Sequence, residues 1–153
     1  MSDQTAPDQN AHLLTDDAAI LALARGLRRI AILGIKTEAQ SDQPGYYVPA
    51  YLSGSGLELV PVPVYYPEAT VILGQPVVRD LTKAGPVDAV VLFRRSADVG
   101  HHVEELLQLK PKAVWLQTGI RNDAAAARLA AAGIDVVQDR CLMVEHKRAV
   151  SGS

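Results

Sequence analysis

The fold class of this chain follows from one stretch, Arg28-Arg29-Ile30-Ala31-Ile32-Leu33-Gly34-Ile35-Lys36. Two basic residues precede four apolar ones, and a glycine follows. An apolar run without polar alternation is typical of a strand buried on both faces, as in a parallel sheet. Gly34 stands where such a strand must turn, and a glycine there lets the backbone come close to a ligand. We therefore expect a first strand over 29–34 and a nucleotide-type ligand at its carboxyl end.

Strand and helix patterns alternate along the rest of the chain. Further strands are expected over 57–62, 87–93, 113–116 and 134–137. The helix signals between them include a proline at a favoured first position and residues that can cap a helix or stop it. They are Thr15 or Asp16, Gly26, Pro44, Ser96 or Asp98, Asn122 and Gly133. Because crossovers between parallel strands are right-handed, this order predicts a doubly wound α/β fold, with a mostly parallel five-stranded sheet and helices on both faces.

The 153 residues suit a single domain with one core. Residues 1–12 are polar, rich in Gln, Asp and Ala, and are expected to form a disordered tail. The domain is expected over 13–148, followed by a short C-terminal tail over 149–153. A last helix is expected from Cys141 to Lys147.

Charge and cysteine content exclude several classes of protein. The formal net charge is −2, whereas dedicated nucleic-acid binders carry a basic excess. Cys141 is the single cysteine, so no internal disulfide can form, which fits a reducing cytoplasm. No apolar run has the length of a signal core or a membrane span. We expect a cytoplasmic protein that binds neither membranes nor nucleic acid.

The loops at the carboxyl ends of the expected strands are cationic and aromatic. Such a set suits a ligand with phosphates and a ring that can stack. Backbone amides at the start of the helix at Gly45 and Tyr46 can hold a pyrophosphate. The loop residues in question are Lys36, Tyr46, Tyr65, Tyr66, Arg94, Arg95, Gln117, Gly119, Arg121 and Arg140.

An NAD-type ligand fits this pattern less well. Gly34 stands alone, without a following G-x-G-x-x-G motif. The second strand ends in Pro63, Val64 and Tyr65, where an NAD site offers Asp or Glu to a ribose. The absence of Asp or Glu after the second strand suits an adenine nucleotide with a 3′-phosphate better than it suits NAD.

No paired carboxylates, nucleophilic triad or metal cluster stands out in the sequence, so we expect no catalytic residue and no metal. His101 and Glu105 have the spacing of two metal ligands but lack a third, and are expected on a solvated helix face. We interpret Cys141 as a small buried residue. The alternative, a thiol on the ligand side, follows from its place after the last strand.

Several segments together resemble a known family. They are Ile30–Gly34, Pro44–Leu52, Val60–Pro63, Ile72–Gly74, Val87–Arg95, Ala113–Ile120 and Asp139–Leu142. These segments resemble the small stand-alone CoA-binding proteins, which are similar to the CoA-binding domain of the succinyl-CoA synthetase alpha subunit. The most specific of them are Trp115-Leu116-Gln117-x-Gly119-Ile120 and Asp139-Arg140-Cys141.

The resemblance implies a Rossmann-type fold that binds coenzyme A, or an acyl-CoA, without a reaction of its own. Carried over by position, the contacts are expected in three groups. The CoA loop comprises Gly34, Ile35, Lys36, Gly45 and Tyr46; the adenine lies near Pro63 and Val64; Phe93, Arg94, Gln117, Gly119 and Ile120 line the rest. Many members have a serine where this chain has Ile35-Lys36 and an arginine before Pro44, so Lys36 is expected to supply the missing charge.

Two alternatives stay open on the sequence alone. One is an NAD(P)-binding, oxidoreductase-like protein, although 153 residues leave little room for a substrate domain. The other is a regulatory or interaction subunit that senses CoA and acts through a protein partner.

Overall fold

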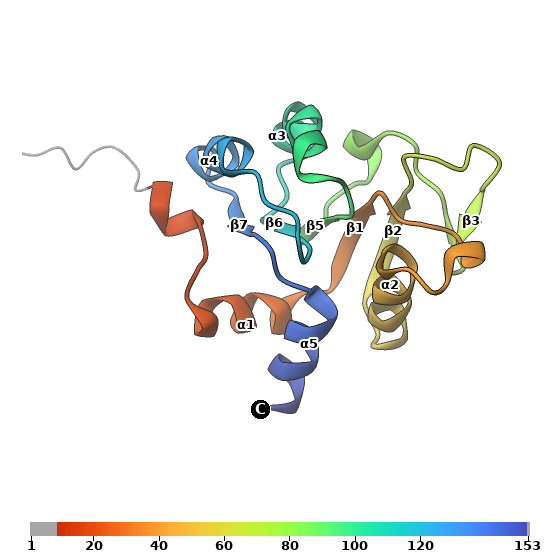
Figure 1. The fold of residues 1–153 in the computed structure, drawn as a ribbon, viewed down its shortest axis with the longest axis horizontal. Helices are drawn as coiled ribbons and strands as arrows, with labels where there is room; N and C mark the ends of the chain where they lie inside the picture. Colours follow the sequence, from red (N-terminus) through yellow and green to blue (C-terminus); the bar gives the residue numbers. More distant parts are fainter. Residues whose placement is uncertain (1–8, 153) are drawn as a thin grey trace, which may run out of the picture.

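Within residues 9–152, which the computed structural model describes, five parallel strands form one sheet through the centre of the molecule (Figure 1). Their spatial order is β2-β1-β5-β6-β7. The bounds are β1 Arg29–Leu33, β2 Glu58–Val62, β5 Ala89–Leu92, β6 Ala113–Leu116 and β7 Asp135–Val137. This order confirms the predicted doubly wound sheet, and every pairing within it is parallel.

Strand β1 divides the core, as its unbroken apolar run predicts. Side chains of successive strand residues point to opposite faces. Ile30 and Ile32 therefore pack in one apolar cluster, and Ala31 and Leu33 pack in the other. All four are fully or almost fully buried. Both faces of the sheet are consequently covered.

The α-helices lie on the two faces in two groups, which Figure 1 shows on opposite sides of the sheet. Helices α1, α2 and α5 cover the face of Ile30, and α3 and α4 cover the face of Leu33. Their bounds are α1 Asp17–Gly26, α2 Pro44–Gly54, α3 Val103–Leu109, α4 Asp123–Ala131 and α5 Leu142–Ser151. Helix α5 is longer than the sequence predicted and includes residues 149–151, which were assigned to the C-terminal tail.

Most predicted helix ends are confirmed. Pro44 is the first residue of α2. The side chain of Asn122 accepts a hydrogen bond from the N–H of Ala125 at 3.0 Å, and Asp16 accepts one from Ala19 at 3.0 Å. These caps satisfy backbone donors that the first turn of a helix leaves unpaired.

The predicted cap at Ser96 or Asp98 is wrong. The chain forms a 3-10 helix over Ser96–His102 (η4), and its N-cap makes no side-chain hydrogen bond. Both candidate side chains are engaged elsewhere. Ser96 Oγ accepts from the N–H of Arg121 at 2.9 Å, and Asp98 accepts from Arg95 Nε at 2.9 Å.

Shorter elements lie at the β2 side of the sheet and between the main elements. Strands β3 and β4 form an antiparallel hairpin. The N–H of Val78 donates to Pro61 in β2 at 2.9 Å, which attaches this region to the sheet. The remaining short elements are β3 Val71–Ile72, β4 Gln75–Pro76 and the 3-10 helices Gln9–His12, Glu38–Gln40 and Leu81–Lys83.

The N-terminal segment lies against β7. The expected tail over 1–12 falls outside the described residues up to 8, and Gln9–His12 is a 3-10 helix. Leu13 then forms a parallel bridge with Val136, and the N–H of Leu14 donates to the carbonyl of Val136 at 2.9 Å. The segment thus continues the sheet beyond its last strand.

Candidate functional site

The carboxyl ends of β1 and β5 lie side by side where the strand order reverses. The chain moves outward from β1 to β2 and then returns to β5 on the other side of β1. Ligands of open parallel sheets bind outside the strands at such a switch point. A cavity of about 670 Å3 lies there. Its lining residues are Lys36, Pro44, Gly45, Tyr47, Val48, Phe93, Arg94, Arg95, Gln117, Thr118, Ile120, Cys141, Met143 and Val144.

Half of the predicted ligand contacts line this cavity. They are Lys36, Gly45, Phe93, Arg94, Gln117 and Ile120. These residues come from four separate segments that the sheet brings to one edge. Their contact with a ligand stays a prediction.

The other half lies outside the cavity wall. Ile35 and Pro63 are buried, and Val64 and Gly119 are exposed. Tyr46 lines a second, smaller cavity of about 300 Å3 together with residues of the β3–β4 hairpin. These positions also stay predictions.

Gly34 supports the packing of the sheet. It has a φ of +87°, a conformation that favours glycine. A Cβ atom there would lie 2.4 Å from the carbonyl oxygen of Phe93, the residue that follows β5. The absence of a side chain is therefore needed for packing as well, and contact of Gly34 with a ligand stays a prediction. Gly34 lets β1 turn against the end of β5.

Lys36 crosses the cavity wall over Gly45. The N–H of Lys36 donates to the carbonyl of Gly45 at 3.0 Å, and a Cβ at Gly45 would lie 3.0 Å from Cγ of Lys36. The lysine stem thus uses the space that the missing side chain leaves. Among the described residues, no carboxylate pairs with the Lys36 ammonium. Its charge is available to an anion.

Arg94 is held in the cavity by hydrogen bonds that connect it to His102 and then to Glu105. Arg94 Nε donates to His102 Nε2 at 3.1 Å, and His102 Nδ1 lies 2.8 Å from Glu105 Oε2. An imidazole that accepts at Nε2 carries its proton at Nδ1, so His102 donates to Glu105 and is neutral. The Arg94 guanidinium also lies 6.0 Å from the centre of the Tyr65 ring. The Arg94 side chain is only 13% exposed.

Arg95 is a weaker source of positive charge than its neighbour. Its side chain is 84% exposed and donates to Asp98 at 2.9 Å. This hydrogen bond lowers the pKa of the Asp98 carboxyl and raises the pKa of Arg95. Asp98 is therefore ionised and offsets the Arg95 charge.

The opposite side of the cavity is apolar. The sequence did not predict an apolar side of the ligand site. Tyr47 comes from the first turn of α2, and Met143 and Val144 come from the first turn of α5. Helical spacing can identify Tyr47, since Pro44, Tyr47 and Val48 share one face of α2. Cys141 also lines the cavity and is only half-buried, so its interpretation as a buried residue is wrong.

His101 and Glu105 differ in exposure, although the sequence predicted both on a solvated helix face. His101 is exposed, whereas Glu105 is half-buried against His102. Within residues 9–152, no group of three potential ligands is placed to hold a metal ion. Nor does that part of the chain contain a helix with the length and apolar character needed to span a membrane.

Residues 28–147 match the family model of the CoA binding domain. This chain belongs to that family. The uncharacterized protein YneT of Bacillus subtilis (strain 168) is similar to it, with 32% identity over 130 residues, which cover 84% of this chain and 93% of YneT. The family match includes every segment that contributes a wall to the cavity.

Solved structures agree with this assignment. A protein from Thermus thermophilus has 38% sequence identity and a TM-score of 0.79, and the match covers 88% of this chain and 99% of the other. A hypothetical protein from Pyrococcus horikoshii OT3 has 25% identity and a TM-score of 0.78, with 97% and 99% covered. These two solved structures are thus similar to this chain in length as well as in fold.

Proposed function

We propose that this chain is a coenzyme A-binding protein whose ligand lies in the 670 Å3 cavity, with its phosphates near Lys36 and Arg94. The observation that carries the proposal is the pair of cations at the switch point of the sheet. Lys36 has no carboxylate partner among the described residues. Arg94 donates to His102, and its Nη2 lies 3.8 Å from the Asp98 carboxylate, which also accepts from Arg95. Two such charges in a member of the CoA binding domain family suit a ligand with several phosphates.

The end of β2 favours CoA over NAD. Strand β2 is followed by Pro63 and Val64, which offer no carboxylate to a ribose diol. CoA carries a phosphate at the 3′ position of that ribose, and a carboxylate there would repel it. The protein should therefore discriminate in favour of CoA.

Titration calorimetry with CoA and NAD tests the proposal. We expect CoA to bind and NAD to bind much more weakly or not at all. Tighter binding of NAD, or no binding of CoA to folded protein, would overturn the proposed function.

Charge removal tests the position of the phosphates. A hydrogen bond to a charged group contributes roughly 1.5–3 kcal/mol, so Lys36→Ala should raise the Kd for CoA about tenfold or more. Lys112→Ala is the matched control, because Lys112 is exposed just before β6, at the opposite edge of the sheet. It should leave the Kd unchanged. Equal effects of both variants would show that only net charge matters.

A further inference from the structure

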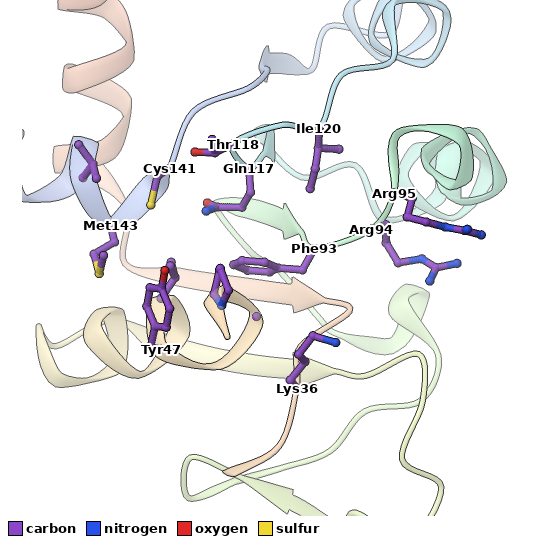
Figure 2. A pocket seen from close by; sticks show the side chains of 14 residues that line it. Lys36, Tyr47, Phe93, Arg94, Arg95, Gln117, Thr118, Ile120, Cys141 and Met143 are labelled. Carbon is purple, nitrogen blue, oxygen red and sulfur yellow. The ribbon is translucent and has the colours of Figure 1, made fainter. Parts of the chain in front are cut away.

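The cavity has two chemically different sides, which Figure 2 shows facing each other. Lys36, Arg94 and Arg95 lie on one side, and Tyr47, Cys141 and Met143 lie on the other. The cationic side suits the phosphates of CoA. Free CoA ends in a small thiol, whereas an acyl thioester of CoA ends in an apolar chain.

The apolar side is open in the absence of a ligand. Tyr47 is 41% exposed and Val144 is 46% exposed, although both line the same cavity. They come from two different helices, α2 and α5, whose first turns meet there. Apolar area that a ligand removes from water contributes about 25 cal/mol per Å2 to its binding. A ligand with an apolar end can use this area.

Gln117 offers a hydrogen-bond donor in the same cavity. It is only 4% exposed, and its Oε1 accepts the N–H of Leu142 at 2.9 Å. Because the oxygen must face that N–H, the amide group has a single orientation. The Nε2 atom has no partner among the described residues. Figure 2 shows the amide directed toward the side of Cys141 and Met143. A carbonyl oxygen of the ligand is the natural acceptor.

We propose that the ligand of this protein is an aliphatic acyl thioester of CoA. The acyl chain lies against Tyr47, Met143 and Val144, and the thioester carbonyl accepts a hydrogen bond from Gln117 Nε2. No acidic side chain lines the cavity, and the cations are on the other side. The proposal rests on the proposed function, since it needs the phosphates at Lys36 and Arg94.

A chain-length series tests the apolar side. Calorimetry with CoA, acetyl-CoA, butyryl-CoA and hexanoyl-CoA should give a Kd that falls with length, by up to about fourfold for each methylene that is buried. Val144→Thr replaces one methyl group with a hydroxyl group and adds no charge, so it should reduce this gain, measured as the ratio of the Kd of CoA to the Kd of hexanoyl-CoA. Lys36→Ala should instead raise the Kd of all four ligands by the same factor.

The outcomes separate the two proposals. Binding of CoA with no dependence on chain length would overturn the acyl inference and leave the CoA site standing. Failure of all four ligands to bind would overturn the proposed function itself. A gain with chain length that is unchanged in Val144→Thr would place the acyl chain elsewhere and overturn the assignment to this side.

A second pair of ligands tests Gln117. S-hexyl-CoA has a chain of the same carbon number as hexanoyl-CoA but lacks the thioester carbonyl. Gln117→Glu keeps an oxygen for Leu142 and replaces the donor with an acceptor. It should weaken the binding of hexanoyl-CoA more than the binding of S-hexyl-CoA, because only hexanoyl-CoA has the thioester carbonyl. Equal weakening of both ligands would mean that Gln117 Nε2 does not donate to the thioester carbonyl but to an amide carbonyl of the pantetheine arm. That result would overturn this part of the proposal.

Thiol labelling locates the acyl end independently of affinity. Cys141 is half-buried in the cavity wall, so iodoacetamide should label it in the free protein. Saturating hexanoyl-CoA should slow the labelling more than saturating CoA does. Equal protection by both ligands would contradict the proposed position of the chain.

Discussion

Two glycines beside the cavity show how differently single residues act on this protein. Gly34 has a positive φ and no space for a Cβ next to the backbone of Phe93. Gly45 has an ordinary φ, and its missing side chain is replaced by the stem of Lys36. The first glycine supports the fold, and the second supports the position of a charge.

We expect Gly45→Ala to weaken the binding of CoA with little loss of folding stability. The new methyl group would lie 3.0 Å from Cγ of Lys36, and that flexible stem would move away from its present path. Gly54→Ala, at the other end of α2, is the control, because nothing lies within 4 Å of its Cβ position. Calorimetry should show a higher Kd for the first variant alone. An unchanged Kd would mean that Lys36 binds equally well from another position.

Gly34→Ala should instead lower the stability of the fold. Overpacking against backbone costs roughly 1–3 kcal/mol, and the positive φ adds strain. Denaturant unfolding should show a lower midpoint. A midpoint equal to that of the native chain would contradict the close approach of β1 and β5.

At the scale of elements, helix η4 is a support for Arg94. The segment holds His102 beneath the guanidinium and carries Asp98 toward Arg95. An α-helix capped by Ser96 or Asp98, as the sequence predicted, would place the side chains of His102 and Asp98 differently. The 3-10 geometry is therefore part of the site.

A double-mutant cycle measures this support. His102→Leu removes the acceptor of Arg94 Nε, so the guanidinium loses its position and the Kd for CoA should rise several-fold. In an Arg94→Ala background the same substitution should have almost no further effect, since coupled residues are not additive. Additive losses would show that His102 acts on stability or on another contact.

At the scale of the whole molecule, α5 connects the cavity to the far end of the core. Its first turn lines the cavity, and further along it His146 is 6% exposed and lies 2.9 Å from the Tyr51 hydroxyl of α2. Burial lowers the pKa of His146 below its usual value of 6.5. The folded protein therefore holds this imidazole in its neutral form.

The pH dependence of stability follows from that shift. Below about pH 6.5 the unfolded chain takes up a proton at His146 that the folded chain does not bind, so acidification favours unfolding. We expect Tm to fall between pH 7 and pH 5, and His146→Gln to flatten this part of the curve. Asp17 provides a contrast, because hydrogen bonds from Arg148 and Arg140 lower its pKa from 3.8 to about 2. Its contribution is lost only below about pH 4, so Asp17→Asn should not change the slope between pH 7 and pH 5.

The sequence predicted the sheet well and the cavity only in part, for a physical reason. A strand buried on both faces, such as β1, carries its signal in consecutive residues. Lys36 and Arg94 could be found because each directly follows such a strand. Met143 and Val144 could not, because their direction depends on where α5 begins relative to the end of β7. The partners of Ser96 and Asp98 are also set by tertiary contacts with no local pattern.

The bridge between Leu13 and Val136 bears on how separate molecules meet. An outer strand presents unpaired N–H and C=O groups, and these can pair with a strand of another copy. In this chain the hydrogen bond from Leu14 to Val136 uses one of those groups on β7, and His12 lies 2.8 Å from Asp135 beside it. A shortened chain that starts at Thr15 would present β7 bare. Its tendency to self-associate through this strand should then rise with concentration, while the cavity at the switch point between β1 and β5 stays as it is.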